Sequence, residues 1–486
     1  LTLTGTYMVG VSGSGVGAQS GGALTATSLQ IGPYAGSTGS FTFGGASSTM
    51  ALSQLYVGLR GNGSFIMGNT ATVNLSSQLV VGYFDTATNA SFTQNSGTIN
   101  APSSFIGVDG NASFEQAAGN HVVGGTLYLG YGPGGSGSYT LSSGTLSSNS
   151  AYVGRAGGGS FVQNGGTHTV ANALVLGQLV GSSGSYTLNG GMLQVGSLQR
   201  GQGGASFNWT RGVLDVGTSL AVGPGEVFSS YLSVGDGKEL VTPTLTVVGS
   251  STLSVGGGDV AVQTLNNQGR TNLLAGVLDI GSQLNNSGIL AMSGGSIAGT
   301  GSMTNTGSLT GAGNIVISGP FINTSLWRPE AGTLFLQASG GVTNDGLLEL
   351  QPGARLQVAA PWSNRGQVQL AGGVLSGGTI TNGSTGLISG QGSIAALDNA
   401  GLLSVSGGSL SVTGNLTNSG ITQLGGTGSQ LAGLGLLTNT GTVQGAGNVG
   451  MRVANSGTLE AIGGTLSFSA LSNTNTATGT LLAGAG

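Results

Sequence analysis

The sequence predicts an all-β protein that folds as a right-handed parallel β-helix (β-solenoid) of about 20–24 rungs. Two observations lead to this fold class: short motifs recur at a near-constant spacing, and strand-length apolar pieces alternate with Gly, Ser and Asn. A third is that no segment shows a helical apolar period. Each repeat of a solenoid forms one coil and buries its apolar face only against its neighbours.

The first half of the chain repeats an apolar pair closed by glycine. Leu55-Tyr-Val57-Gly58 and Leu127-Tyr-Leu129-Gly130 are two copies. With looser copies included, the motif's glycines are residues 10, 32, 58, 82, 107, 130, 154, 177, 201 and 223. We therefore expect residues 1–223 to form a β-solenoid with repeats of about 24 residues.

Each of these repeats also carries one aromatic residue that follows Gly-Ser or Ala-Ser. Like positions stack in a solenoid, so the aromatic residues are expected to form one core ladder. Its members are Phe41, Phe65, Phe92, Phe114, Tyr139, Phe161, Tyr186 and Phe207.

The second half repeats the pattern apolar-x-Asn-x-Gly, as in Leu416-Thr-Asn418-Ser-Gly420. We expect residues 263–486 to form a β-solenoid with repeats of about 19 residues. The side-chain amides are expected to form hydrogen bonds to the rungs above and below. The asparagines of the pattern are residues 267, 286, 305, 323, 344, 364, 382, 399, 418, 439, 455 and 473, and the clearest copies contain Asn286, Asn305, Asn344, Asn364, Asn418 and Asn439.

Residues 224–262 contain Pro224, Pro243 and a local group of charges, so they are expected to be an irregular junction within the solenoid. A second break is expected at residues 323–330, where the glycine is missing and Trp327-Arg-Pro-Glu330 follows. We expect an extruded loop there.

The composition excludes several classes of protein. Charged residues are 5% of the chain and the net charge is −4, so there is no basic stripe for nucleic acid. Cysteine is absent, which excludes a disulfide scaffold and thiolate metal sites. There is no apolar run long enough for a transmembrane helix, and no motif indicates a cofactor or a metal ion.

The sequence does not predict an enzyme or any catalytic residue. The 14 acidic residues are scattered along the chain. Asp345 and Glu349 are close in sequence, with only Arg355 as a basic neighbour. His121 and His168 are expected to be surface or turn residues, since polysaccharide-cleaving β-helices need several acids on one face.

The sequences at both ends of the chain are similar to the repeats. The first residue is Leu rather than Met, so the numbering is expected to start after processing or within a longer protein. Uncapped terminal rungs expose unpaired strand edges, which can pair with another copy and build a head-to-tail filament. The residues expected at this polymer interface are Leu1, Leu3, Tyr7, Val9, Leu481 and Leu482.

The repeats resemble those of bacterial secreted β-helix proteins, namely autotransporter passenger domains and surface proteins with autotransporter-associated strand repeats. The resemblance rests on segments 127–140 and 416–420. It implies an extracellular or bacterial cell-surface location. The first expectation is a structural filament subunit whose partners are its own copies. The alternative is a monomeric adhesin that binds carbohydrate or another surface component through loops near residues 133–137 and 327–330.

Overall fold

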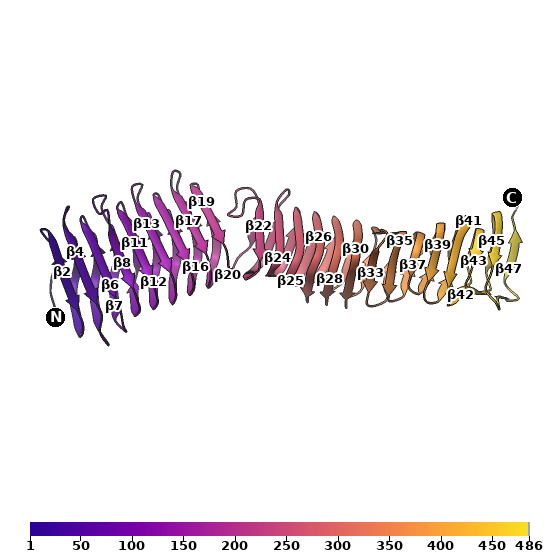
Figure 1. Ribbon diagram of the computed structural model, residues 1–486, viewed down its shortest axis with the longest axis horizontal. Helices are drawn as coiled ribbons and strands as arrows, with labels where there is room; N and C mark the ends of the chain where they lie inside the picture. The colour runs from indigo at the N-terminus through magenta and orange to yellow at the C-terminus, as the bar shows by residue number, and fades with distance from the viewer. Residues whose placement is uncertain (485–486) are drawn as a thin grey trace. The chain divides into compact units, whose positions relative to one another are not determined.

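The computed structural model describes residues 1–484, and every regular element in that range is a β-strand (Figure 1). The strands pair in parallel and stack as about 23 turns of a β-solenoid, which confirms the predicted fold class. The described chain contains two compact units. Unit 1 comprises residues 1–229 and 236–243, and unit 2 comprises residues 230–235 and the chain from Thr244 onward.

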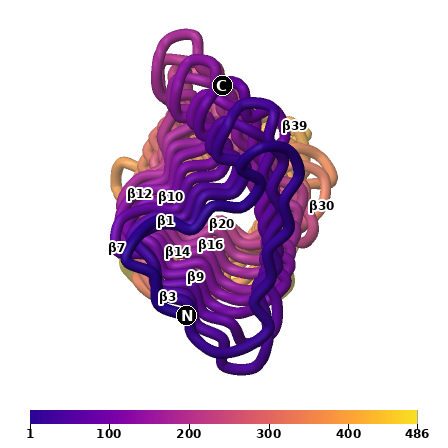
Figure 2. The backbone as a smooth tube through the Cα atoms, turned by 90° about the vertical axis from the view of Figure 1, so that its left-hand side faces the viewer, coloured from indigo at the N-terminus to yellow at the C-terminus, as the bar shows by residue number. Residues whose placement is uncertain are grey.

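Unit 1 is built from two sets of parallel strands, so that its coils lie one behind another (Figure 2). The first is a nine-stranded sheet of β2 (Ser14–Gln19), β4 (Thr38–Phe43), β6 (Asn62–Met67), β8 (Ala90–Gln94), β11 (Asn111–Gln116), β13 (Ser136–Leu141), β15 (Gly158–Gln163), β17 (Ser183–Leu188) and β19 (Gly204–Trp209). The second set contains β1 (Thr6–Val9), β3 (Ala23–Ile31), β5 (Thr49–Val57), β7 (Thr72–Val81), β9 (Thr98–Ala101), β10 (Ser103–Ile106), β12 (Asn120–Leu129), β14 (Thr145–Val153), β16 (Thr167–Leu176), β18 (Met192–Arg200), β20 (Gly212–Val216) and β21 (Leu220–Val222).

The chain passes between the units at β22 (Tyr231–Gly235), which belongs to unit 2, and β23 (Lys238–Val247), which begins in unit 1 and ends in unit 2. Both strands lie within residues 224–262, where the sequence indicated a junction.

Unit 2 alternates long strands with short strands that end in asparagine. The long strands and their shorter pieces are β24 (Thr252–Asn267), β25 (Arg270–Asn286), β26 (Ile289–Gly299), β28 (Ser308–Ile317), β30 (Leu326–Ala338), β32 (Leu347–Leu350), β33 (Ala354–Val358), β35 (Gln367–Gly377), β37 (Leu387–Ile394), β39 (Leu402–Val412), β41 (Ile421–Gly433), β43 (Thr442–Val449), β45 (Thr458–Phe468) and β47 (Thr480–Ala483). The short strands are β27 (Ser302–Asn305), β29 (Phe321–Asn323), β31 (Val342–Asn344), β34 (Trp362–Asn364), β36 (Ile380–Asn382), β38 (Leu397–Asn399), β40 (Leu416–Asn418), β42 (Leu436–Asn439), β44 (Arg452–Asn455) and β46 (Thr474–Asn475).

The repeated glycines have two physical causes. In unit 1, Gly130 has φ +63°, a left-handed conformation that glycine adopts without the steric cost a Cβ brings. In unit 2, a Cβ on Gly366 would lie 2.2 Å from the backbone oxygen of Gly346 in the preceding rung. The motifs therefore end in glycine because each coil must turn sharply or approach its neighbour closely.

Candidate functional site

The interior of unit 1 contains a continuous aromatic ladder. From Phe41 to Phe207 the eight ladder residues stack with successive ring centroids 4.6–5.6 Å apart and ring planes 2–20° from parallel. The first seven side chains are buried and Phe207 is half-buried. The register pairs each ring with the next, as in Phe92 with Phe114. Such offset stacking adds a specific contribution of about 0.5–1.5 kcal/mol per pair to the burial of the rings.

A polar chain accompanies this ladder at two rungs. Tyr139 Oη donates a hydrogen bond to Gln116 Oε1 at 2.6 Å, and His121 Nδ1 lies 3.1 Å from Tyr139 Oη. Gln116 Nε2 donates to the backbone oxygens of Gly119 and Thr145 and so holds the turn. Tyr186, Gln163 and His168 repeat the arrangement at the same distances. The burial raises the pKa of both tyrosine hydroxyls well above 10.

The expectation that the two histidines are surface or turn residues is wrong. His121 and His168 are 0% exposed and stack against Phe114 and Phe161 at 5.0 and 4.7 Å. The pKa of each is lowered from 6.5 to about 3, by burial in both cases and for His168 also by the nearby His121. Because the tyrosine hydroxyl donates to glutamine, it accepts from Nδ1–H, which makes both rings neutral Nδ1–H tautomers. They are core packing groups.

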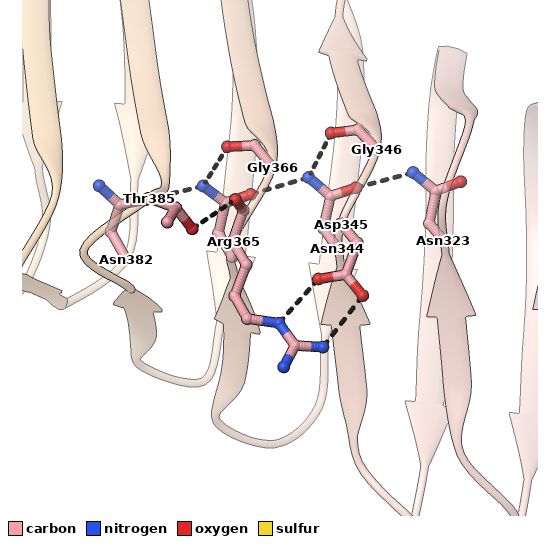
Figure 3. A network of polar contacts seen from close by, with 9 residues as sticks. Asn323, Asn344, Asp345, Gly346, Arg365, Gly366, Asn382 and Thr385 are labelled. Carbon is pink, nitrogen blue, oxygen red and sulfur yellow. Dashed lines mark hydrogen bonds and ion pairs between the residues drawn. The ribbon is translucent and has the colours of Figure 1, made fainter.

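Unit 2 is held by an asparagine ladder (Figure 3). Asn344 Nδ2 donates to Asn364 Oδ1 at 2.7 Å, and Asn364 Nδ2 donates to Asn382 Oδ1 at 2.7 Å. The same bond joins each ladder asparagine to the next at 2.6–2.8 Å, from Asn267 to the last described rung. All the donors point toward the C-terminal rungs. The ladder includes Asn286, Asn305, Asn344, Asn364, Asn418 and Asn439.

The last member of the ladder differs from the sequence expectation. Asn455 Nδ2 donates to Asn475 Oδ1 at 2.6 Å, and Asn475, not Asn473, is its register partner. Asn473 instead accepts a hydrogen bond from the backbone nitrogen of Val453. The last turn has two asparagines two residues apart, and only the strand register decides which of them faces the ladder.

At the end of unit 1 that contains residue 1, the interface residues expected from the sequence have different environments. Leu1 is 72% exposed, Leu3 and Tyr7 are half-buried, and Val9 is buried. The Tyr7 ring packs edge-on against Phe41 at 6.1 Å and so covers the first ring of the aromatic ladder. In the described chain, β1 pairs with β3 alone and β2 with β4 alone. This end therefore presents strand edges.

The last described rung of unit 2 also presents an edge. Leu481 pairs in register with Leu459, and the inward-facing ladder continues back through Val443, Thr422 and Leu403. Leu459 is 8% exposed, whereas Leu481 is 64% exposed and Leu482 is 48% exposed. Leu481 therefore occupies a core position that no further rung covers within residues 1–484.

The solenoid brings acidic residues next to basic partners that are distant in sequence. Arg365 forms a bidentate ion pair with Asp345, with Nε–Oδ1 at 2.7 Å and Nη2–Oδ2 at 3.0 Å (Figure 3). Arg328 Nε lies 2.8 Å from Glu349 Oε2. Arg355, the only basic neighbour found in sequence, takes no part in these pairs. Both pairs are partly exposed, so each contributes little to stability.

The break expected at residues 323–330 is not an extruded loop. Residues 326–338 form strand β30, and Trp327 is 0% exposed between its register partners Leu309 and Leu348. The side chain of Trp327 occupies an inward-facing position of the ladder. The chain therefore continues as a regular strand through this segment. The turn at Pro133 and Gly134 is exposed, and Ser136–Gly137 already belong to β13.

Sequence reasoning missed an outward-facing row of side chains on unit 1. The row contains Gln30, Tyr56, Val80, Phe105, Tyr128, Tyr152, Val175 and Gln199, which are successive register partners on β3 to β18. The sequence feature that could have revealed this row is the middle residue of the Leu-x-Val-Gly motif. Its side chain points away from the core because successive side chains of a strand point to opposite faces.

No protein-family model matches this chain, and no curated protein matches it in sequence. Among residues 1–484 there is no group of three or more His, Cys, Asp or Glu side chains placed to hold a metal ion. The same range contains no helix with the length and apolar character needed to cross a membrane.

Proposed function

We propose that this chain is a structural protein of the bacterial exterior whose copies associate end to end through β-strand pairing. The observation that carries the proposal is the position of Leu481. This residue continues an inward-facing apolar ladder, yet it is 64% exposed. A parallel rung added to β47 would bury Leu481 and use the free backbone groups of the strand.

The outer edge of β47, which has no partner strand within residues 1–484, has the backbone groups needed for such pairing. The backbone nitrogens of Thr480 and Gly484 donate to the backbone oxygens of Gly457 and Ala461, on the side of β45. Because hydrogen-bonding direction alternates along a strand, the N–H groups of Leu481 and Ala483 face the free edge. The strands at the other end of the sequence, β1 and β2, each have one partner in the described chain.

The surface chemistry also supports association. Natural proteins protect sheet edges with lysine, proline or inward-pointing charge. The strand Thr480–Ala483 contains neither charge nor proline. With 5% charged residues over the whole chain, repulsion between copies is weak.

The test is electron microscopy and sedimentation of the purified protein and three variants. Filaments are expected from the native chain, and Ala483→Pro is expected to abolish them because proline removes an N–H from the free edge. Leu481→Glu should do the same by placing a charge in the new core. Leu434→Glu is the matched control, because Leu434 is 97% exposed in a turn and its substitution should leave filaments intact.

Deletion of residues 1–10 tests the opposite end, since it removes β1 and the contact of Tyr7 with Phe41. Filaments should be lost while circular dichroism still reports folded β-structure. A native protein that stays monomeric at high concentration, or filaments that survive both Ala483→Pro and Leu481→Glu, would overturn end-to-end pairing.

A further inference from the structure

The outward-facing row on unit 1 has a gap in its aromatic residues. Phe105, Tyr128 and Tyr152 stack with centroids 4.9 and 5.4 Å apart and planes 15° and 9° from parallel. On the other side of the gap stands Tyr56, and Val80 occupies the position between Tyr56 and Phe105. The ring face of Phe105 that would meet the next ring of the row therefore has no aromatic partner in register.

A cavity of about 170 Å³ lies at this gap. Its lining side chains are Gln78, Val80, Tyr83, Phe105, Val108 and Tyr131. Val80 is 1% exposed and is the most buried of the six. Pockets for drug-sized ligands measure about 300–1,000 Å³, so this one has room for a single ring.

Further rings fix the walls of the cavity. Tyr131 packs edge-on against Phe105 at 5.2 Å and against Tyr128 at 5.0 Å. Tyr83 packs edge-on against Tyr56 at 5.9 Å. The guanidinium of Arg155 lies 4.3 Å from the centre of the Tyr131 ring and covers one of its faces. These contacts hold the rings in place before any ligand arrives.

The cavity combines aromatic surface with uncharged hydrogen-bonding groups. Gln78 Nε2 donates to Tyr56 Oη at 3.0 Å, and the oxygen of the Gln78 amide accepts no hydrogen bond within residues 1–484. The hydroxyls of Tyr83 and Tyr131 have no hydrogen-bond partner among residues 1–484 either. None of the six lining side chains carries a formal charge at neutral pH.

We propose that this cavity binds one hexopyranose ring of a polysaccharide. A hexopyranose has an apolar face of C–H groups, which suits an aromatic wall, and a rim of hydroxyls that both donate and accept hydrogen bonds. Tyrosine hydroxyls and a glutamine amide can both donate hydrogen bonds to the sugar hydroxyls and accept hydrogen bonds from them. A purely apolar ligand would leave these polar groups unpaired, and an ion would find no opposite charge among the lining residues.

The periodic row extends the site along the solenoid. Phe105, Tyr128 and Tyr152 are half-buried and follow one another at each rung. Adjacent sugars of the same chain can contact the exposed edges of these rings. The ligand class is therefore an oligosaccharide rather than a free monosaccharide, since one small ring alone yields limited binding energy.

The experiment uses the full chain on an array of neutral and acidic oligosaccharides, followed by calorimetry with the strongest binder. Tyr83→Ala and Phe105→Ala should each weaken binding by about tenfold, as expected for the loss of one aromatic contact. Val80→Phe should abolish binding, because an aromatic side chain at position 80 fills the gap while matching its neighbours in the row.

Val316→Phe is the control, because it makes the same change on an exposed solenoid face outside the site. Val316 is 41% exposed on β28 of unit 2 and belongs neither to the cavity nor to the outward-facing row. This variant should bind as the native protein does. Hydrogen exchange in unit 1 should show that the variants keep the native fold.

Failure of every oligosaccharide to bind would overturn the proposal, as would binding that Val80→Phe and Tyr83→Ala leave unchanged. If Val80→Phe reduced association between copies instead, the cavity would be a protein contact and the proposal would fail. The end-to-end model is tested separately, because Ala483→Pro should not affect sugar binding.

Discussion

Ser104 Oγ lies 3.0 Å from Nε2 of His121 and completes the hydrogen bonding of a fully buried imidazole. His168 has the same environment, except that its Nε2 has no partner in the described chain. Register pairing through Leu127 places Ala151 at the position equivalent to Ser104. The polar contacts of the two histidines thus differ by one hydroxyl group.

Ala151→Ser is expected to stabilise unit 1 by about 1 kcal/mol, because its hydroxyl can donate to His168 Nε2. Ser104→Ala is expected to destabilise it by roughly 1–3 kcal/mol, since it leaves His121 Nε2 unsatisfied. Urea unfolding of both variants gives the two changes. Equal effects of the same sign would contradict this assignment of partners.

The buried histidines make the stability of unit 1 dependent on pH. Their folded pKa values are about 3, below the ordinary 6.5, so the unfolded chain binds protons first as the pH falls. Stability is therefore complete above pH 6.5 and declines between 6.5 and 3. The limiting slope is about 1.4 kcal/mol per pH unit for each histidine.

Hydrogen exchange of the strand amides of Val123 and Val170, corrected for intrinsic rates, measures this decline between pH 7 and 5. The double variant His121→Gln and His168→Gln serves as the control and should show a shallower slope. A native slope no steeper than that of the double variant would mean that the imidazoles titrate near their ordinary pKa.

In the inward-facing ladder of unit 2, the buried hydroxyl of Thr422 has no hydrogen-bond partner among residues 1–484. Thr422 is 0% exposed, and its register partners are Leu403 and Val443. Thr422→Val keeps the shape and removes the buried polar group, so the free energy of unfolding should rise by about 1 kcal/mol. Thr417→Val, at an exposed position, should change it by less than about 0.5 kcal/mol. Destabilisation by Thr422→Val would show that the hydroxyl has a partner, such as a buried water.

Asn364→Ala interrupts the asparagine ladder. It removes the acceptor of Asn344 and the donor of Asn382, at roughly 1–3 kcal/mol for each orphaned group. Local hydrogen exchange around residues 344–382 should report the loss. Asn314→Ala is the control, because Asn314 is exposed on β28 and should tolerate alanine. Similar effects of the two substitutions would argue against the ladder as a source of stability.

Much of the fold could be predicted from the sequence, because a solenoid repeats its physical requirements at every turn. The spacing of Gly58 and Gly130 or of Asn418 and Asn439 reflects coil length directly. The environments of individual residues were harder to predict. The same pattern that places Phe161 inside also places His168 inside, but the sequence does not show that Tyr186 and Gln163 satisfy its polar atoms.

The ion-pair partners Arg365–Asp345 and Arg328–Glu349 lie one rung apart but are 20 and 21 residues apart in sequence, so local reasoning missed them. It also expected a loop at Trp327, since the inward direction of that side chain depends on the register with Leu309. The outward-facing row was missed for the same reason. Its residues are far apart in sequence, and their stacking is evident only when the register places Phe105 beside Tyr128.

The asparagine ladder also makes unit 2 extensible in whole steps. Each amide bonds only to its own turn and to the next, so removal of residues 400–418 would place Asn399 before Asn439 with the same donor, acceptor and glycine. Removal of half a repeat would leave one asparagine amide without an asparagine in the next turn to accept its hydrogen bond. Gene duplication and deletion can therefore change the copy number of turns without new side-chain chemistry, and the length of the unit becomes a variable that selection can adjust one turn at a time.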